Sequence, residues 1–326
     1  MQNKTHIFAF IFISLMCKIK DLRDFDSLFE LMDYFTTEEK CEKYLATIRW
    51  NGEPICPYCE SNDVKVLNGK TKRLKCYGCK NQFGVKVGTI FHDTKISLRK
   101  WFIAVYIITA HKKGISSHQL SRDLKVTQKT AWFILQRIRE AYNPDAEMFS
   151  DEVEVDETYI GGRESNKHAH KKTPGTQGRS TKTKTPVLGI LNRNGNVYAL
   201  PVPDTRKFTI LPIMLNKIER GSTVYTDEYR PYRSLAKDFK HDFVKHNVAE
   251  YVKGMAHTNG IEGFWAILKR GIIGIYHHIS AKHLFRYVNE FSFRYNNRKM
   301  SDGSKFDVAL ANAMNKRLDY KTLING

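Results

Sequence analysis

The chain of 326 residues carries 53 lysines and arginines against 34 aspartates and glutamates, which gives a formal net charge of +19, and 41% of its residues are hydrophobic. This length accommodates two or three domains with real hydrophobic cores, and the positive charge favours nucleic acid or another anionic surface as a partner. A membrane-spanning protein is excluded, because the only long apolar run, residues 7–16, has ten residues and a bilayer needs about 20. A basic protein without a polyanionic partner is the alternative.

The N-terminal residues match a secretion signal only in part. Lys4 precedes the apolar run, but no cleavage site with small residues follows it, and Met16 before Cys17 fits a lipoprotein site poorly. We expect translation to start at Met16 rather than at Met1, and residues 1–24 to be a non-native or disordered extension. The protein is then expected in the cytoplasm, in association with the nucleoid. Residues 25–50 are predicted to form a helical lead-in, with Cys41 on its apolar stripe as a core residue.

Two Cys-x-x-Cys pairs, Cys56 with Cys59 and Cys76 with Cys79, are separated by sixteen residues. This spacing predicts a zinc ribbon over residues 51–92, in which four thiolates hold one structural Zn²⁺. Two disulfides or a redox pair are the alternatives, but disulfides need an oxidising compartment and a redox pair needs no second copy. Basic residues stud the ribbon and favour contact with DNA or protein over a merely solvated face. They are Lys65, Lys70, Lys72, Arg73, Lys75 and Lys80.

Residues 97–142 carry a helical pattern. Residues 117–124 and 127–142 are predicted to form two helices joined by a tight turn, which is typical of a helix-turn-helix; a generic helical hairpin is the alternative. In a helix-turn-helix the first residues of the second helix would meet base edges, and later arginines would meet phosphates. The former are Thr127, Gln128, Lys129 and Thr130, and the latter are Arg137 and Arg139.

After residue 145 the pattern changes from helices to strands. Strands are predicted at 153–160, 186–192, 196–203, 222–227 and 241–246, with a helix at 206–219. The polar loop 163–184 contains Lys171 and Lys172, which we expect to contact the DNA backbone. A domain over 150–300 and a C-terminal tail over 301–326 complete the predicted organisation.

A later helix, within residues 256–270, carries Glu262 and Lys269 seven residues apart, so both lie on one face. Phe264, Ile267 and Leu268 are predicted to pack this helix against a core. Asp156 lies within the strand at 153–160 and Asp227 ends the strand at 222–227. Between Asp227 and Glu262 lie 34 residues.

This order of acids resembles the catalytic signature of DDE transposases. Four motifs narrow the resemblance to one group of these enzymes. They are Val-Asp-Glu-Thr-Tyr-Ile-Gly-Gly (155–162), Thr-Asp-Glu-Tyr-Arg-Pro-Tyr (226–232), the longer motif at 257–270, and Tyr-His-His-Ile-Ser (276–280). They are similar to those of bacterial insertion-sequence transposases with an N-terminal zinc ribbon, of the ISXO2-like or IS1595 type. The resemblance covers about residues 25 to 307.

The resemblance implies a multidomain α+β chain, with a zinc ribbon and helix-turn-helix followed by a ribonuclease H-like α/β catalytic domain. It implies an enzyme that binds the terminal inverted repeats of an insertion sequence and cleaves and transfers DNA strands. Double-stranded DNA, at the element ends and the target, would be its partner, and a homodimer or larger synaptic assembly would pair the ends. Two Mg²⁺ (or Mn²⁺) ions would be held by Asp156, Asp227 and Glu262, while Lys269 and Arg270 would contact DNA.

Asn259 is the rival for the third catalytic position, since parts of this family use Asn there. Asn offers a metal only a neutral carbonyl oxygen, so Glu262 is the better ligand. A capping box, with Asn259 as N-cap and Glu262 three residues later, is the structural alternative. Two other functions stay open: a DNA-binding regulator or decayed transposase that binds without cutting, and a nuclease or recombinase of the ribonuclease H-like kind that cuts without joining.

Overall fold

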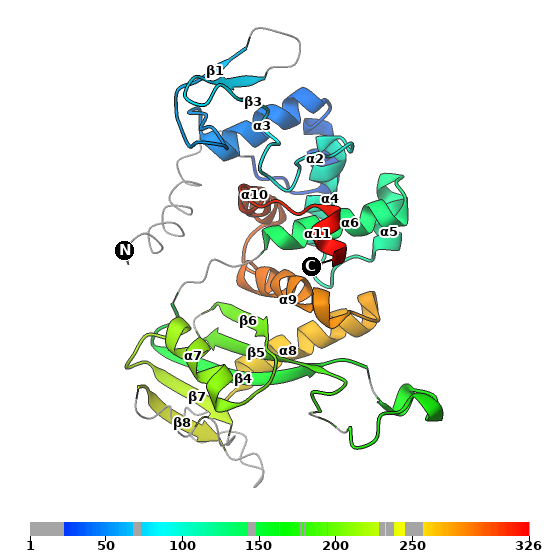
Figure 1. The fold of residues 1–326 in the computed structure, drawn as a ribbon, viewed down its shortest axis with the longest axis vertical. Coiled ribbons are helices and arrows are strands. Elements are labelled where there is room, and N and C mark those ends of the chain that lie inside the picture. Colours follow the sequence, from blue (N-terminus) through cyan, green and yellow to red (C-terminus); the bar gives the residue numbers. More distant parts are fainter. Residues whose placement is uncertain are drawn as a thin grey trace. The chain divides into compact units, whose positions relative to one another are not determined.

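The computed structural model describes residues 23–67, 73–142, 148–162, 164–176, 178, 180–193, 195–227, 232, 238–244 and 257–325. They divide into two compact units (Figure 1). The N-terminal unit holds the described residues up to 142 together with residues 299–325, and the sheet unit holds the described residues from 148 to 298. Within these ranges no helix has both the length and the apolar character that crossing a membrane requires.

The N-terminal unit is mainly helical. Its helices before residue 143 are α2 (Leu28–Tyr34), α3 (Glu38–Trp50), α4 (Leu98–Ala110), α5 (Ser117–Leu124) and α6 (Gln128–Ala141). Each begins after a serine or threonine whose hydroxyl accepts a hydrogen bond from a backbone amide three residues on, which satisfies one of the unpaired donors of the first turn. Cys41 is fully buried in α3, as the apolar stripe predicted.

The C-terminal residues, predicted as a tail, form helices α10 (Asp302–Asn312) and α11 (Tyr320–Asn325). Phe306 of α10 is fully buried, and its ring lies 5.5 Å from that of Phe102 in α4 and 6.1 Å from that of Phe25. These aromatic contacts pack α10 into the N-terminal unit, although about 200 residues of sequence separate it from α4.

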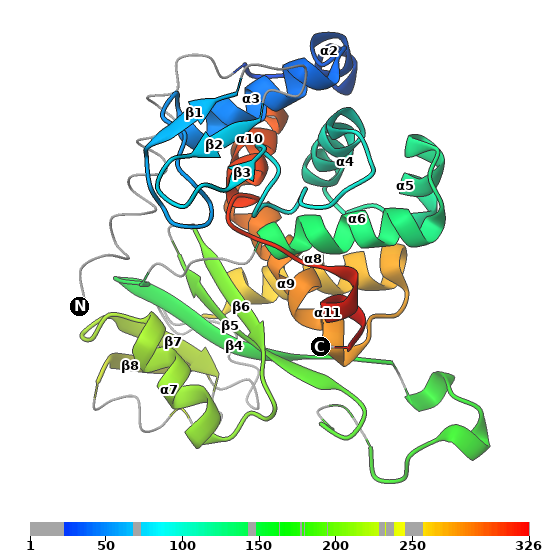
Figure 2. The ribbon, with the colours of Figure 1, turned by 45° about the horizontal axis from the view of Figure 1, so that its top comes forward.

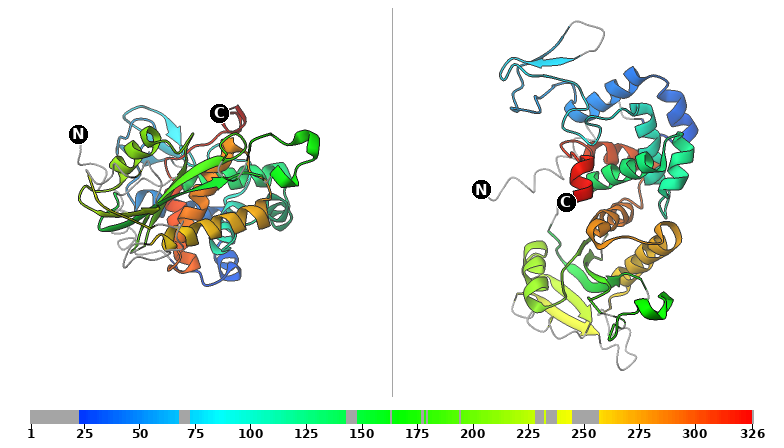
Figure 3. Two further views of the ribbon diagram at one scale, coloured as in Figure 1. Left: turned by 90° about the horizontal axis from the view of Figure 1, so that it is seen from below. Right: turned by 45° about the vertical axis from the view of Figure 1, so that its right-hand side comes forward.

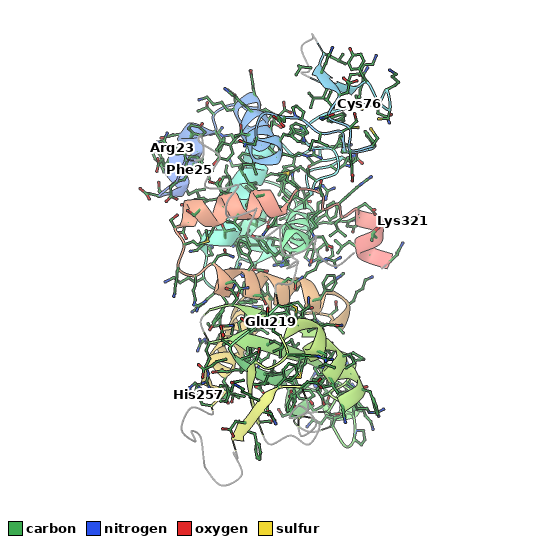
Figure 4. The ribbon with its side chains drawn as sticks, turned by 90° about the vertical axis from the view of Figure 1, so that its left-hand side faces the viewer. Arg23, Phe25, Cys76, Glu219, His257 and Lys321 are labelled. Carbon is green, nitrogen blue, oxygen red and sulfur yellow. The ribbon has the colours of Figure 1, made fainter. Side chains whose placement is uncertain are left out.

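A three-stranded antiparallel sheet forms the ribbon part of the N-terminal unit. It runs in the order β1 (Val64–Val66), β2 (Leu74–Cys76) and β3 (Gln82–Phe83). Leu74, Cys76 and Phe83 point into a small core of their own, to which Cys56 also belongs. Figure 4 labels Cys76 at the end of β2. Such a small core needs additional stabilisation to fold.

A five-stranded mixed sheet forms the centre of the sheet unit (Figure 2). Its strands are β4 (Glu152–Ile160), β5 (Thr185–Asn192), β6 (Val197–Pro201), β7 (Thr223–Asp227) and β8 (Lys240–Val244), close to the predicted positions. The spatial order is β6-β5-β4-β7-β8, with β6, β5 and β4 antiparallel and with β7 and β8 added in parallel.

Helices cover both faces of this sheet (Figure 3). On one face α7 (Lys207–Lys217) packs Ile210 and Met214 against odd-numbered residues of β4, Val153 and Val155. On the other face lie α8 (Asn259–Gly271) and α9 (Ala281–Asn296), whose apolar residues pack on Ile160 and on β5 and β6. A π-helical turn, Ile272–Tyr276, follows α8. This arrangement is consistent with a ribonuclease H-like domain.

Candidate active site and metal centre

The four cysteines of the two Cys-x-x-Cys pairs converge in the ribbon. Their sulfur atoms all lie within 4.8 Å of one another, with 3.6 Å between Cys56 Sγ and Cys79 Sγ and 3.6 Å between Cys59 Sγ and Cys76 Sγ. A tetrahedral Zn²⁺ with bonds of about 2.3 Å requires sulfur separations of about 3.8 Å, whereas a disulfide requires about 2.0 Å. The arrangement therefore fits one structural zinc ion and excludes disulfides among these four.

Backbone and side-chain amides prepare this cluster for a cation. The amide of Cys79 donates to Cys76 Sγ at 3.5 Å, and the side-chain amide of Asn81 donates to Cys79 Sγ at 3.4 Å. Backbone amides lower the pKa of the Cys76 thiol and lower that of Cys79 to about 6. At Cys59 the effect of the Ser61 amide is outweighed by hydrogen bonds with the other cysteines, chiefly Cys79, and by desolvation, which together raise the pKa of Cys59 to about 12. Thiolates, the form that binds a metal, are thus favoured at two of the four ligands.

Asp156 and Asp227 occupy neighbouring parallel strands. The ladder between β4 and β7 pairs Glu152 with Thr223 and Glu154 with Tyr225. Continued by two residues, this register sets Asp156 opposite Asp227, with both side chains on the same face of the sheet. The two carboxylates are close enough for the charge of Asp227 to raise the pKa of Asp156.

The surroundings of Asp156 disfavour its negative charge. Burial, with smaller contributions from the charges of Glu157 and Asp227, raises its pKa to about 7. Trp265 of α8 donates its indole Nε1–H to Asp156 Oδ2 at 3.0 Å, which acts in the opposite direction. Glu157 points to the other face, where the Tyr232 hydroxyl donates to it at 2.8 Å. A cation beside Asp156 would offset this accumulation of acids.

Trp265 reaches Asp156 because the residue beside Asp156 on the neighbouring strand β5 is a glycine and has no side chain. Gly189 of β5 pairs with Asp156, and a Cβ atom at Gly189 would lie 2.5 Å from the Trp265 ring. The absence of a side chain lets the indole lie directly on the sheet.

Glu154, two residues before Asp156 on the same face, holds the start of α8. It is buried, and its Oε2 accepts a hydrogen bond from the Ile261 amide at 3.0 Å, while Arg193 Nε donates to its Oε1 at 3.0 Å. Arg193 also donates to the carbonyl of His257 at 2.9 Å, and its guanidinium lies 3.8 Å from the Tyr225 ring centroid. Figure 4 labels His257 where the chain enters α8.

Sequence reasoning missed Glu154 and Arg193. The signal was available for Glu154, since period-two alternation places it on the same strand face as Asp156. No local pattern marks Arg193, which contacts Glu154 only through the pairing of β4 with β5.

Helix α8 carries Glu262, Lys269 and Arg270, all of them exposed. The capping alternative is wrong, because Thr258 is the N-cap and Asn259 is already the first helical residue. The Thr258 hydroxyl instead donates to Glu262 Oε1 at 3.0 Å. Ile267 is also exposed, and Ile261, Phe264, Trp265 and Leu268 form the buried side of the helix.

Lys269 lies close enough to Asp156 for the two charges to interact. Although Lys269 is exposed, neighbouring atoms partly desolvate its ammonium group and lower its pKa, and the charge of Asp156 acts against that decrease. Among the described residues, the four cysteines form the one set of three or more candidate ligands whose atoms converge to within metal-binding reach. The carboxylates of Asp156, Asp227 and Glu262 are therefore not drawn together around a single point.

The candidate DNA contacts of α6 differ in accessibility. Thr127, Gln128 and Lys129 are exposed, and Thr130 is half-buried. The prediction for Arg137 is wrong: this residue is 4% exposed, and its guanidinium donates to the carbonyls of His92 and Leu318. Arg139 is likewise buried. Residues 134–139 of α6 are all buried, so both arginines lie inside the N-terminal unit rather than on a surface that phosphates could reach.

The loop between β4 and β5 consists mainly of polar residues. It contains two short 3₁₀ turns, Glu164–Asn166 and Ala169–Lys171, and the amide of Thr173, two residues after the second turn, donates to the Glu164 carboxylate at 3.0 Å. Lys171 and Lys172 are exposed there, as expected of residues that would contact a backbone.

The chain combines a ribbon with four converging cysteines and a mixed sheet whose adjacent parallel strands carry paired acids. Residues 148–296 match the ISXO2-like transposase domain, and residues 36–82 match the transposase zinc-ribbon domain. An uncharacterized protein in the transposable element ISH50 of Halobacterium salinarum is 30% identical over 272 residues, which cover 80% of this chain and 91% of that protein. An uncharacterized transposase-like protein of Haemophilus influenzae is 32% identical over 105 residues, covering 32% of this chain and 84% of that protein.

The chain therefore belongs to the ISXO2-like transposase family with an N-terminal zinc ribbon. The family resemblance inferred from the motifs is confirmed. One of these relatives belongs to an archaeal element, so membership of the family does not show that this chain is bacterial. The bacterial origin stays a prediction.

Proposed function

We propose that this chain is an active DDE transposase, which binds the ends of its own mobile element and cleaves and rejoins DNA strands there. The observation that carries the proposal is the register of β4 and β7, which sets Asp156 opposite Asp227 beneath the helix that bears Glu262 and Lys269. Family membership supports the same reaction class.

The residues present suit a hard divalent cation, because all three candidate ligands are carboxylates. Asp156 and Asp227 would hold one edge of the site and Glu262 the other. When bound there, two Mg²⁺ or Mn²⁺ ions would supply the positive charge that activates an attacking oxygen and stabilises the departing 3′-oxygen. Water would first break a phosphodiester at the element end and leave a 3′-hydroxyl, which would then attack a target phosphodiester in line.

The remaining residues would position DNA. Lys269, on the same face of α8 as Glu262, would contact a phosphate close to the scissile bond. The exposed first turn of α6 would enter the major groove as part of a helix-turn-helix, with Thr127, Gln128 and Lys129 at base edges. Lys171, Lys172 and Arg270 would contact backbone phosphates. Because two ends must be joined to one target, the working assembly would be a dimer or larger.

The test is strand transfer by the purified full chain, with DNA that carries the element's own ends and with Mg²⁺. Wild type is compared with Asp227→Ala, Glu262→Ala and Asn259→Ala. Joining by wild type, with loss in both acid variants, supports the proposal. If Glu262→Ala remains active while Asn259→Ala is inactive, Glu262 is not the third ligand. Binding of the ends without any cutting would instead identify a regulator or an inactive descendant, and cutting without joining a nuclease.

A further inference from the structure

The outer face of the ribbon sheet gathers positive charge around one aromatic ring. Leu74 and Cys76 of β2 point into the ribbon core, so Lys75 between them points outward, and Tyr77 follows in the turn after β2. Lys65 of β1 is the direct cross-strand partner of Lys75. Two ammonium-bearing side chains therefore stand opposite each other on the same face, an arrangement that destabilises a strand pair.

A third lysine, Lys80, directly follows the second Cys-x-x-Cys pair. Lys80 has a left-handed backbone, with φ of 63°, which directs the chain back toward β2. The Nζ atoms of Lys65, Lys75 and Lys80 lie 5.3, 5.6 and 5.6 Å from the centroid of the Tyr77 ring. Tyr77 is 38% exposed, and its backbone amide donates to the Asp63 carbonyl at 2.8 Å, which ties the turn that bears the ring to the start of β1.

The Tyr77 ring offsets the mutual repulsion of these charges only in part, because an exposed cation–π contact is weak. Within the described part of the chain, none of the three lysines has a carboxylate at ion-pair distance. Three converging ammonium groups without an internal counterion match a ligand that carries closely spaced negative charges.

We propose that Lys65, Lys75 and Lys80, gathered around Tyr77, form a binding site for the phosphodiester backbone of duplex DNA. The inference rests on the proposed function, since it assumes that the protein works on DNA, but it does not depend on the catalytic acids. Lysine ammonium groups on flexible stems bind phosphates as point charges, so the site contributes affinity and orientation without reading sequence. Cys76 and Cys79 flank Tyr77, so zinc binding holds the site together.

The test measures the DNA affinity of the zinc-loaded full chain at several salt concentrations. The logarithm of the binding constant falls with the logarithm of the salt concentration, and each phosphate contact makes this slope steeper by about 0.9. The triple variant Lys65→Gln, Lys75→Gln, Lys80→Gln should therefore have a slope that is shallower by about 2 to 3. The matched control replaces three exposed lysines elsewhere in the N-terminal unit, Lys43, Lys95 and Lys299, with Gln. It removes the same charge and should leave most of the slope intact.

Tyr77 gives a second readout. Tyr77→Phe keeps an aromatic ring and should bind DNA like wild type, whereas Tyr77→Leu should weaken binding several-fold in the wild-type background and not in the triple variant. If wild type binds DNA and the triple variant has the same slope, or if the control lowers the slope equally, the inference is overturned while the proposed function stands. If wild type binds an acidic protein surface through these lysines and no DNA, both are overturned.

Discussion

The carboxylate of Glu154 accepts a hydrogen bond from the backbone amide of Ile261 at 3.0 Å, which ties strand β4 to the first turn of α8. The negative charge of Glu154 lies at the positive end of the helix, where it is favourable. Gly260 makes this approach possible, because a Cβ atom there would lie 2.8 Å from Glu154 Oε2. The helix that bears Glu262 is thus attached to the strand that bears Asp156.

Replacing Glu154 should destabilise the sheet unit. Glu154→Ala leaves the largely buried guanidinium of Arg193 with only the more distant carboxylate of Glu152, at 3.6 Å, and should cost up to about 3–5 kcal/mol, whereas Glu154→Gln keeps an acceptor for Ile261 and should cost less. Urea unfolding of the full chain, followed by circular dichroism, measures both. Equal stability of Glu154→Ala and wild type would show that the contact does not hold α8.

Gly189→Ala should separate α8 from the sheet. The added methyl group would lie 2.5 Å from the Trp265 ring and 2.8 Å from Ile261 Cδ1, and such overpacking costs about 1–3 kcal/mol. Strand-transfer activity should fall with it, because Trp265 would move from Asp156. Gly263→Ala is the control within α8: no atom lies within 4 Å of its added Cβ, and alanine favours a helix by about 1 kcal/mol. Comparable activity losses in both variants would contradict the prediction.

The sequence predicted the strand positions, with Asp156 inside one strand and Asp227 at the end of another, because each depends on patterns within about ten residues. It did not predict the return of α10 to the N-terminal unit, since the contact of Phe306 with Phe25 joins residues far apart in the chain. Arg137 was wrongly predicted as a DNA contact. Its burial depends on carbonyls of His92 and Leu318, which no local pattern reveals.

Trp265→Phe should change the pH dependence of the reaction. The indole N–H lowers the pKa of Asp156, so its removal raises that pKa further above its ordinary value. A carboxylate with a raised pKa is protonated over a wider range, so metal binding and activity at pH 7 should fall. The acidic limb of the pH–rate profile should move upward by up to about one pH unit, with recovery at higher pH. Trp132→Phe, in the N-terminal unit, should leave the profile unchanged; a Trp265→Phe loss that is equal at every pH would exclude this role.

Removal of a single ribbon thiol should abolish zinc binding. Cys59→Ala leaves three ligands in a cluster too small to fold on its hydrophobic core alone, so zinc content should fall from one ion per chain toward zero. Cys41→Ala is the matched control, since burial raises the pKa of the Cys41 thiol to about 12 and the residue lies in helix α3, outside the cluster. Metal analysis of the purified variants decides the point. Loss of zinc in Cys41→Ala, or retention in Cys59→Ala, would contradict the assignment of ligands.

Asp307 should make the N-terminal unit less stable as the pH rises. It is buried in α10 beneath the Tyr44 hydroxyl, which donates to it at 2.6 Å, and burial raises its pKa to about 7 against an ordinary value of 3.8. Between these values the folded state holds a proton that the unfolded state has lost, so this contribution to stability is complete at low pH and disappears as pH rises through about 7. Asp307→Asn keeps an acceptor for Tyr44 without the charge, so its stability relative to wild type should increase by about 1.4 kcal/mol between pH 6 and pH 8. Urea unfolding of both zinc-loaded proteins at the two pH values measures the difference. A difference that does not change with pH would mean that Asp307 is already ionised in the folded protein at pH 6.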